Sequence, residues 1–285
     1  MTTRFIAAYD TEKKDDCLQA CAAIRAAHER HDFPGTFFIV GKRLEEEGRG
    51  YRDLLGDVPG FEIASHTYSH IILRDHPFCG NRPDDATRRR EIMLGKEWVE
   101  QTFQRPCVGL RPGCGFHNAL RGDKWLLDTV ADAGFGYVSS LLWGPETTLP
   151  ALLVPPFTYA EDGHPALWEL PGHGWHENLL KAHNLTVSVK RILAWPSPMP
   201  EAIRLTPIHT PEEEFAMNRL FIDRAVALGL PYVSLIWHPW SLARFDPAMR
   251  MLDLTFAYVR ELGLEATTYQ AEWERARARI AQPAA

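Results

Sequence analysis

The sequence lacks the long apolar runs and the surplus of basic residues that accompany membrane or nucleic-acid binding. No stretch approaches the roughly 20 apolar residues that a transmembrane helix needs. The formal net charge is −6, the pI is near 6.1, and acidic and basic residues are mixed along the chain. This distribution gives no electrostatic footprint for a polyanion. We therefore expect a protein that binds neither a membrane nor a nucleic acid.

The N-terminal residues do not have the pattern of a secretory leader, and we expect none there. The first ten residues, MTTRFIAAYD, contain neither a basic start nor an apolar core followed by a small-residue cleavage site. The five cysteines are an odd number without paired spacing, which favours reduced thiols over a disulfide framework. Both observations predict a cytoplasmic protein.

Several common active-site motifs are absent. No Gly-rich phosphate loop follows a predicted strand and no G-x-S-x-G elbow occurs, so nucleotide-binding and serine-hydrolase functions are excluded. The segment HENLLKAH (176–183) misses the HExxH spacing of zinc proteases because residue 180 is leucine. The acidic segment 10–16 lacks the spaced ligands and the glycine of a calcium loop.

The sequence does contain a regular alternation of short β-rich runs and longer amphipathic ones. Strand candidates lie at 4–10, 35–41, 61–66, 107–112, 135–143, 167–172, 231–239 and 264–268. Helical patterns lie at 13–31, 42–55, 86–104, 120–133, 211–229 and 246–262. This rhythm predicts an α/β fold with a mostly parallel sheet, either closed into a barrel or open and doubly wound.

The region 144–210 interrupts this rhythm and is rich in proline, histidine and tryptophan. It is too apolar for disorder and too irregular for a helix, which is typical of a long functional loop. We find no domain boundary, so residues 1–285 are expected to form a single catalytic domain with this loop inserted. A Trp/Pro-rich loop of this kind could also serve an interface in a homo-oligomer.

Polar side chains with metal-binding or acid–base chemistry follow several of the predicted strands. They are Asp10, Glu12, His66, His70, Arg111 and His238. In a parallel α/β barrel the carboxyl ends of the strands meet at one face, so these side chains would converge. Two imidazoles and a carboxylate can hold a divalent metal and leave positions open for water and a carbonyl oxygen. A second carboxylate could deprotonate that water, and a histidine could protonate the leaving group.

In this order the motifs resemble those of the polysaccharide deacetylases, the NodB-homology group also called carbohydrate esterase family 4. The matching segments are the acidic turn 10–12, SHTYSH (65–70), LRPG (110–113), GHGWHE (172–177) and LIWHP (235–239). The resemblance implies a distorted, NodB-like (β/α) barrel of about seven parallel strands. It also implies metal-dependent removal of an acyl group from an N- or O-acylated substrate.

The resemblance assigns a role to each of these residues. It makes Asp10 the base, Arg111 the residue that keeps the base ionised, and His238 the general acid. The metal ligands would be Glu12, His66 and His70. The family normally has two adjacent aspartates after the first strand, whereas this chain has Asp10, Thr11 and Glu12. Either Asp10 or Glu12 could therefore be the third ligand.

A Trp- and His-containing set is expected to contact the substrate, namely His173, Trp175, His176 and Trp240. The ligand set accepts Zn, Fe, Co, Ni or Mn without clear preference. We expect a deacetylase or amidohydrolase that acts on a small-molecule or glycan-precursor substrate, an acylated sugar or a small amide. The alternatives are a metal-free, allantoinase-like hydrolase of a cyclic amide and a barrel protein that binds without catalysis.

Overall fold

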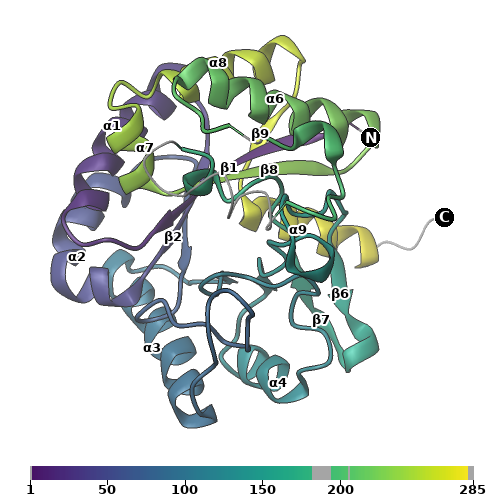
Figure 1. The fold of residues 1–285 in the computed structure, drawn as a ribbon. Coiled ribbons are helices and arrows are strands. Elements are labelled where there is room, and N and C mark those ends of the chain that lie inside the picture. Colours follow the sequence, from purple (N-terminus) through teal and green to yellow (C-terminus); the bar gives the residue numbers. More distant parts are fainter. Residues whose placement is uncertain (1, 182–193, 205, 282–285) are drawn as a thin grey trace.

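The computed structural model, which describes residues 2–181, 194–204 and 206–281, has helices arranged around one sheet (Figure 1). The strands are β1 (Arg4–Thr11), β2 (Gly35–Ile39), β3 (Phe61–Ser65), β4 (Gly109–Leu110), β5 (Tyr137–Val138), β6 (Phe157–Tyr159), β7 (His164–Glu169), β8 (Tyr232–Trp237) and β9 (Ala266–Thr267). The α-helices are α1 (Asp16–His31), α2 (Gly41–Leu55), α3 (Asp85–Phe103), α4 (Lys124–Asp132), α6 (Pro211–Ala227), α7 (Pro239–Phe245), α8 (Arg250–Glu261) and α9 (Tyr269–Ala281).

The sheet forms a distorted (β/α) barrel, as the sequence predicts. Its strand order is β6-β7-β5-β4-β3-β2-β1-β8, with β9 paired to β1, and every pairing except that of β6 with β7 is parallel. Parallel neighbours need crossover connections, which place helices on the outer face of the sheet. Figure 1 shows α1, α2, α3, α4, α6 and α8 around the ring of strands.

The barrel wall is irregular between β7 and β8, which no strand ladder joins in the part of the chain that the structure describes. The chain that follows β7 bridges this gap. The backbone N–H of His173 donates to the carbonyl of Ser234 (3.1 Å), and the Ser234 N–H donates to Nδ1 of the His173 ring (3.1 Å). The Tyr232 hydroxyl donates to the carbonyl of Pro171 (3.0 Å). Loop backbone and an imidazole thus replace a strand pairing.

Strand side chains alternate between the barrel interior and the layer under the helices. In β1, Phe5 and Ala7 belong to the outer core, whereas Ile6 and Ala8 belong to the interior. The other buried residues of the interior cluster are Phe38, Ala64, Tyr137, Trp168, Leu170, Tyr232 and Tyr269. Because Tyr269 begins α9, this helix covers one end of the barrel.

Three elements were not predicted from the sequence, namely β6, α7 and α9. Three predicted strands, those over 107–112, 135–143 and 264–268, are reduced to two residues each. The strand predicted over 135–143 is reduced to β5. It ends because the next amides bond to a side chain: the N–H groups of Ser140 and Leu141 both donate to Oε1 of Glu169 (2.7 and 2.8 Å).

The described part of the region predicted as a long loop, 144–210, contains the β6–β7 hairpin and four short 3-10 turns. Residues 182–193, which include His183, and residue 205 lie outside the described part of the chain.

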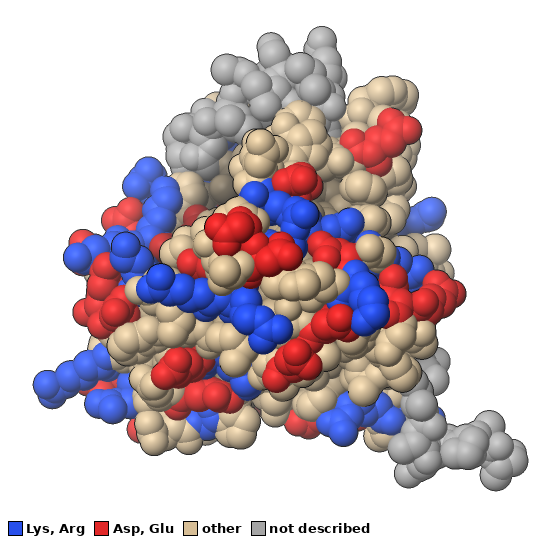
Figure 2. Space-filling model, turned by 90° about the horizontal axis from the view of Figure 1, so that it is seen from below, with Lys and Arg blue, Asp and Glu red and all other residues tan. Residues whose placement is uncertain are grey.

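The surface carries charges of both signs. On the face shown in Figure 2, lysine and arginine side chains alternate with aspartate and glutamate, and no large patch of one sign is visible. Among the described helices, none is both long and apolar enough to cross a membrane.

Candidate active site

The alternation of the strands carries several polar side chains into the mouth of the barrel. Asp10 has the same phase in β1 as the interior residues Ile6 and Ala8. His66, Arg111 and His238 directly follow β3, β4 and β8 at the carboxyl ends of the strands. All four of these side chains are buried. The structure therefore brings together residues that lie up to 228 positions apart in the chain.

Asp10 and Arg111 form a buried ion pair. Nη1 of Arg111 donates to Oδ1 of Asp10 (2.7 Å), Nη2 donates to Oγ of Ser139 (2.9 Å), and the guanidinium lies over the ring of Phe38, 3.9 Å from its centre. Burial alone would raise the pKa of Asp10, but the charge of Arg111 holds it well below its ordinary range. Asp10 is therefore a carboxylate at neutral pH, and its Oδ2, which Arg111 does not bond, lies 3.9 Å from Nε2 of His66.

His66 presents an unprotonated ring nitrogen to the site. Its Nδ1–H donates to the carbonyl of Arg111 (2.7 Å), so in the neutral ring Nε2 carries the lone pair. Nε2 is buried, has no hydrogen-bond partner, and lies 3.9 Å from Oδ2 of Asp10. Burial lowers the pKa of His66 to about 4, so the ring stays neutral. A buried and orphaned lone pair of this kind fits a metal ligand.

Glu12 and His70 complete a set of donors around this nitrogen. Nε2 of His70 lies 3.0 Å from Oε2 of Glu12, and the donor atoms of Glu12, His66 and His70 all lie within 4.8 Å of one another. The segment 66–70 is a turn, with left-handed φ at Thr67 (60°) and His70 (63°), and not the start of a helix. The two histidines therefore meet through this turn and not through a shared helix face.

Trp240 holds Glu12 in place. Its indole Nε1–H donates to Oε1 of Glu12 (3.0 Å), and the Lys13 ammonium lies over the indole ring, 3.2 Å from its centre. Because Oε1 is held by Trp240, Oε2 remains for His70 or a metal. The sequence predicted that Trp240 contacts the substrate; in the structure its indole N–H is bonded to Glu12, and the substrate contact stays a prediction.

His238 is held by Glu177, a residue that the sequence reasoning did not single out. The backbone N–H and the ring Nδ1–H of His238 both donate to Oε1 of Glu177 (2.8 and 3.1 Å). Burial alone would lower the pKa of His238, but the hydrogen bond to Glu177 and the charges of Glu12 and Asp10 raise it to about 9. His238 is therefore a cation at neutral pH.

Glu177 belongs to a buried charge network that extends away from the site. Lys181 forms an ion pair with Oε2 of Glu177, and its Nζ lies 3.5 Å from Oε1 of Glu214. Burial alone would raise the pKa of Glu177, but the charges of Lys181 and His238 lower it to about 2. The only signal for Glu177 in the sequence was its place in GHGWHE, where an acid follows the Trp and His residues.

The remaining predicted substrate contacts separate into two groups. His173 uses both ring nitrogens on backbone groups, with Nε2 donating to Val154 (3.1 Å), and Trp175 donates Nε1–H to the carbonyl of Ala202 (2.9 Å). Both have structural contacts. His176 lines the site, where its Nε2–H donates to the carbonyl of Leu142 (3.0 Å), and burial lowers its pKa to about 4.

A cavity of about 320 Å³ opens onto these residues. Its lining consists of Asp10, Glu12, His70, Ile72, Cys79, Cys114, Leu142, His176, Asn178 and His238. The volume lies at the lower end of the range of ligand pockets, about 300–1,000 Å³. The apolar side chains of Ile72 and Leu142 lie among acidic groups and imidazoles. Such a lining suits a small acyl group next to a polar reaction centre.

Two of the cavity-lining cysteines form a disulfide, which corrects the expectation that all thiols are reduced. Cys79 and Cys114 are 35 positions apart in the sequence and are paired in the structure. They join the loop after β3 to the loop after β4, two connections that meet only in the folded barrel. Cys17, Cys21 and Cys107 are free and buried.

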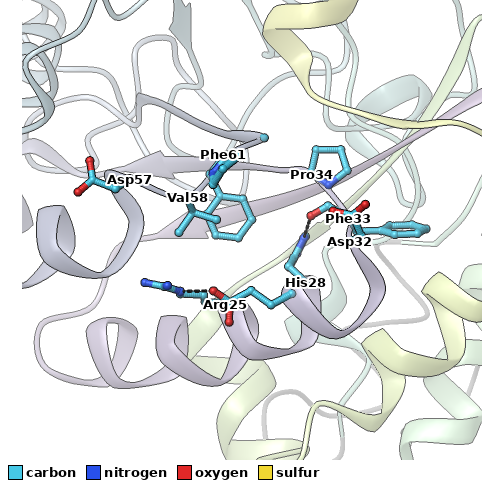
Figure 3. Close-up of a pocket in the computed structure, with 11 residues that line it drawn as sticks. Arg25, His28, Asp32, Phe33, Pro34, Asp57, Val58 and Phe61 are labelled. Atoms are coloured by element: carbon cyan, nitrogen blue, oxygen red, sulfur yellow. Dashed lines mark hydrogen bonds and ion pairs between the residues drawn. The ribbon is translucent and has the colours of Figure 1, made fainter.

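A second hollow, of about 450 Å³, lies at the opposite end of the strands (Figure 3). It is formed by the end of α1 and the turns that precede β2 and β3. Its polar groups bond within the fold: Arg25 pairs with Glu29 (2.7 Å), and Nδ1–H of His28 donates to the carbonyl of Phe33 (2.9 Å). None of the residues predicted for catalysis lines this hollow.

Comparisons with known proteins agree with this fold. Residues 14–136 match the family model for polysaccharide deacetylases. The fold is similar to that of a protein from Mycobacterium smegmatis assigned to the polysaccharide deacetylases, with a TM-score of 0.66 and 19% identity over 99% of this chain and 93% of the other.

Two further solved structures share the fold at lower identity. The allantoinase PuuE aligns with a TM-score of 0.64 and 13% identity over 99% of this chain and 91% of its own. The Bc1960 peptidoglycan N-acetylglucosamine deacetylase aligns with a TM-score of 0.52 and 13% identity over 94% and 86%. No curated protein sequence matches the chain. The resemblance seen in the sequence is thereby confirmed to this extent: residues 14–136 match the polysaccharide deacetylase model, and the chain shares the α/β fold of these solved structures.

Proposed function

We propose that the protein is a metal-dependent hydrolase that removes an acyl group from an acylated sugar or a small amide. The observation that carries this proposal is that the two acids lining one cavity, Asp10 and Glu12, have different partners. Glu12 lies beside two imidazoles in one donor set, whereas Asp10 is paired through Oδ1 with Arg111 and its Oδ2 lies 3.9 Å from Nε2 of His66. A family match to deacetylases and the folds of an allantoinase and a peptidoglycan deacetylase support the same class of reaction.

Glu12, His66 and His70 would hold the metal. The orphaned Nε2 of His66 and the carboxylate of Glu12, whose pKa is lowered by His238 and His70 although burial would raise it, provide deprotonated donors. When bound there, a divalent metal would polarise the acyl carbonyl and lower the pKa of water. Trp240 and the carbonyl of Arg111 orient two of the donors, as outer contacts of metal ligands commonly do.

Asp10 acts as the general base in this proposal. Its Oδ1 is occupied by Arg111, so Oδ2 accepts the proton of the attacking water. Arg111 keeps the carboxylate ionised and fixes its orientation, which a base needs before each turnover.

His238 acts as the general acid. Glu177 accepts the Nδ1–H, so the proton on Nε2 of the imidazolium is the one that can pass to the departing nitrogen or oxygen. A pKa of about 9 keeps this proton in place at neutral pH. An acid and a base with pKa values moved apart by their surroundings are typical of a hydrolytic site.

Removal of a ligand should lower the metal content of the purified protein. Glu12→Gln and His70→Ala each delete one donor, and Trp240→Phe deletes the N–H that orients Glu12. We expect Trp240→Phe to weaken metal binding by about 10- to 100-fold, the usual cost of losing an outer contact, and the two ligand variants to weaken it at least as much. Elemental analysis of tag-free protein and metal titration measure this directly.

The same measurements separate this proposal from the alternatives. A wild-type protein that holds no stoichiometric metal and keeps its activity in a chelator would be a metal-free, allantoinase-like hydrolase. A protein that binds metal but releases no acetate or formate from a panel of acylated sugars and amides would be a binding protein without catalysis.

The pH dependence of catalysis should report the pairing of His238 with Glu177. In the wild type, kcat/KM should fall as the pH rises through about 9, because the imidazolium loses its proton there. Glu177→Gln keeps a hydrogen-bond acceptor but removes its charge, so the pKa of His238 should fall and the basic limb should move toward the ordinary histidine value of about 6.5. A basic limb that is unchanged in this folded variant would contradict the assignment of His238 as the acid.

A further inference from the structure

A second group of metal-binding side chains lies beside the cavity, separate from Glu12 and its two histidines. One ring nitrogen of His76 and the sulfurs of Cys79 and Cys114 all lie within 4.8 Å of one another. His76 is buried, whereas Cys79 is exposed and Cys114 is half-buried. Both cysteines line the cavity, so a small reductant and a metal ion can reach them from the solvent.

These three side chains are gathered by hydrogen bonds that do not depend on the disulfide. His76 and Gly80 exchange two backbone hydrogen bonds (2.9 and 3.0 Å), which close the turn that carries Cys79. The carbonyl of Cys114 accepts the indole N–H of Trp143 (2.6 Å). Because none of these bonds involves a sulfur atom, reduction of the disulfide leaves the thiols and the imidazole close together.

The imidazole of His76 has the tautomer that a ligand next to Cys79 needs. Its Nδ1 accepts the N–H groups of Phe78 and Cys79 (3.2 Å each), so in the neutral ring Nδ1 carries the lone pair and Nε2 carries the proton. The lone pair is therefore directed toward the backbone of Cys79. Both hydrogen bonds are at the long end of the usual range, so a metal ion that takes this lone pair displaces only weak interactions.

The separation of the two cysteines suits a bridging ion as well as a disulfide. Their Cα atoms are 6.7 Å apart, which is near the upper limit of about 6.8 Å for a disulfide. Thiolates that each lie about 2.3 Å from a zinc ion are farther apart than two bonded sulfurs, so they fit this wide separation. Two thiolates and one imidazole are donors typical of zinc, and they leave a fourth position open.

We propose that Cys79, Cys114 and His76 form a second divalent-metal site, of the zinc type, when the disulfide is reduced. A dithiol supplies the two electrons and two protons: its own thiols join in a disulfide, and the bond between Cys79 and Cys114 opens into two thiols. Each thiol releases its proton when the metal binds. The ion then replaces the disulfide as the link between the loops that follow β3 and β4. This site does not depend on the proposed acyl hydrolysis.

Titration of the reduced protein with Co²⁺ tests the proposal, because thiolate-bound cobalt has a charge-transfer absorption in the near ultraviolet that oxygen and nitrogen ligands do not produce. The wild-type protein is reduced with a dithiol, the dithiol is removed without oxygen, and Co²⁺ is added. We expect this absorption in the reduced protein and none in the oxidised protein, whose sulfurs are bonded to each other.

Variants identify the three donors. Cys79→Ser and Cys114→Ser should each abolish the absorption. His76→Asn keeps an acceptor for the two backbone N–H groups and should weaken Co²⁺ binding at least about 10-fold, since losing a ligand costs no less than losing an outer contact. Cys17→Ser changes a buried free cysteine outside the set and should keep the absorption, which makes it the matched control.

Three results would overturn the proposal. They are a reduced wild-type protein with both thiols free and no charge-transfer absorption, a disulfide that stays closed in the folded protein with excess dithiol, and an absorption that survives in the double variant Cys79→Ser, Cys114→Ser. Glu12→Gln removes a donor of the other set and should keep the absorption. An absorption that is retained while hydrolysis is lost in this variant would separate the two sites.

Discussion

Replacement of Asp10 by asparagine should lower kcat by about 10²- to 10⁴-fold, the usual contribution of a general base. Asparagine keeps the shape of the side chain and an oxygen that accepts the hydrogen bond from Nη1 of Arg111. An amide cannot take the proton of an attacking water, so the loss should be confined to the chemical step. Release of acetate from an N-acetylated sugar, followed at saturating substrate, measures this effect.

Metal content in the same variant decides which acid has which role. Asp10→Asn should retain the metal, because Asp10 is outside the donor set of Glu12, His66 and His70. Glu12→Gln should lose both metal and activity. The opposite pattern, with metal lost from Asp10→Asn and kept in Glu12→Gln, would show that the two acids have exchanged roles.

Replacement of Arg111 by methionine should destabilise the fold by about 3–5 kcal/mol, the usual cost of leaving one partner of a buried ion pair uncompensated. Arg111 is fully buried, and it contacts Asp10, Ser139 and the ring of Phe38. Methionine has a similar length, so the main change is the loss of the charge that faces Asp10. Chemical denaturation, with the midpoint and slope compared between variants, measures the free energy of unfolding.

Two further variants separate charge from packing in this result. The double variant Asp10→Asn, Arg111→Met should be less destabilised than Arg111→Met alone, because the buried carboxylate is then neutral. Arg244→Met breaks a half-exposed pair with Asp16 (3.4 Å) and should change stability by less than about 1 kcal/mol. A double variant that is as unstable as the sum of the two single variants would show that packing, and not the ion pair, makes Arg111 important.

The convergence of the polar residues could be predicted because it depends on two regular properties of the chain. A period of two along each strand gives Asp10 the phase of the interior residues, and parallel strands bring their carboxyl ends to one face. Those properties predict that His66, Arg111 and His238 lie near Asp10. The predicted barrel is confirmed on the same grounds.

Residues outside the regular elements could not be placed in the same way. Glu177 lies in a 3-10 turn beyond β7, and its contact with His238 depends on how the loop fills the gap in the barrel wall. The partnership of Cys79 with Cys114 depends on two loops whose spacing in the sequence carries no information about distance. The direction of the Trp240 indole N–H, which decides between holding Glu12 and contacting a substrate, is likewise set by tertiary packing.

The short helix α7 connects two residues that have separate roles in the proposed reaction, His238 and Trp240. His238 precedes its first residue and Trp240 is its second, so the proposed proton donor and the side chain that holds Glu12 belong to one short helical unit. Pro239 at the first helical position fixes the backbone between them. A displacement of this helix would therefore shift the leaving-group side and the water-activating side at once.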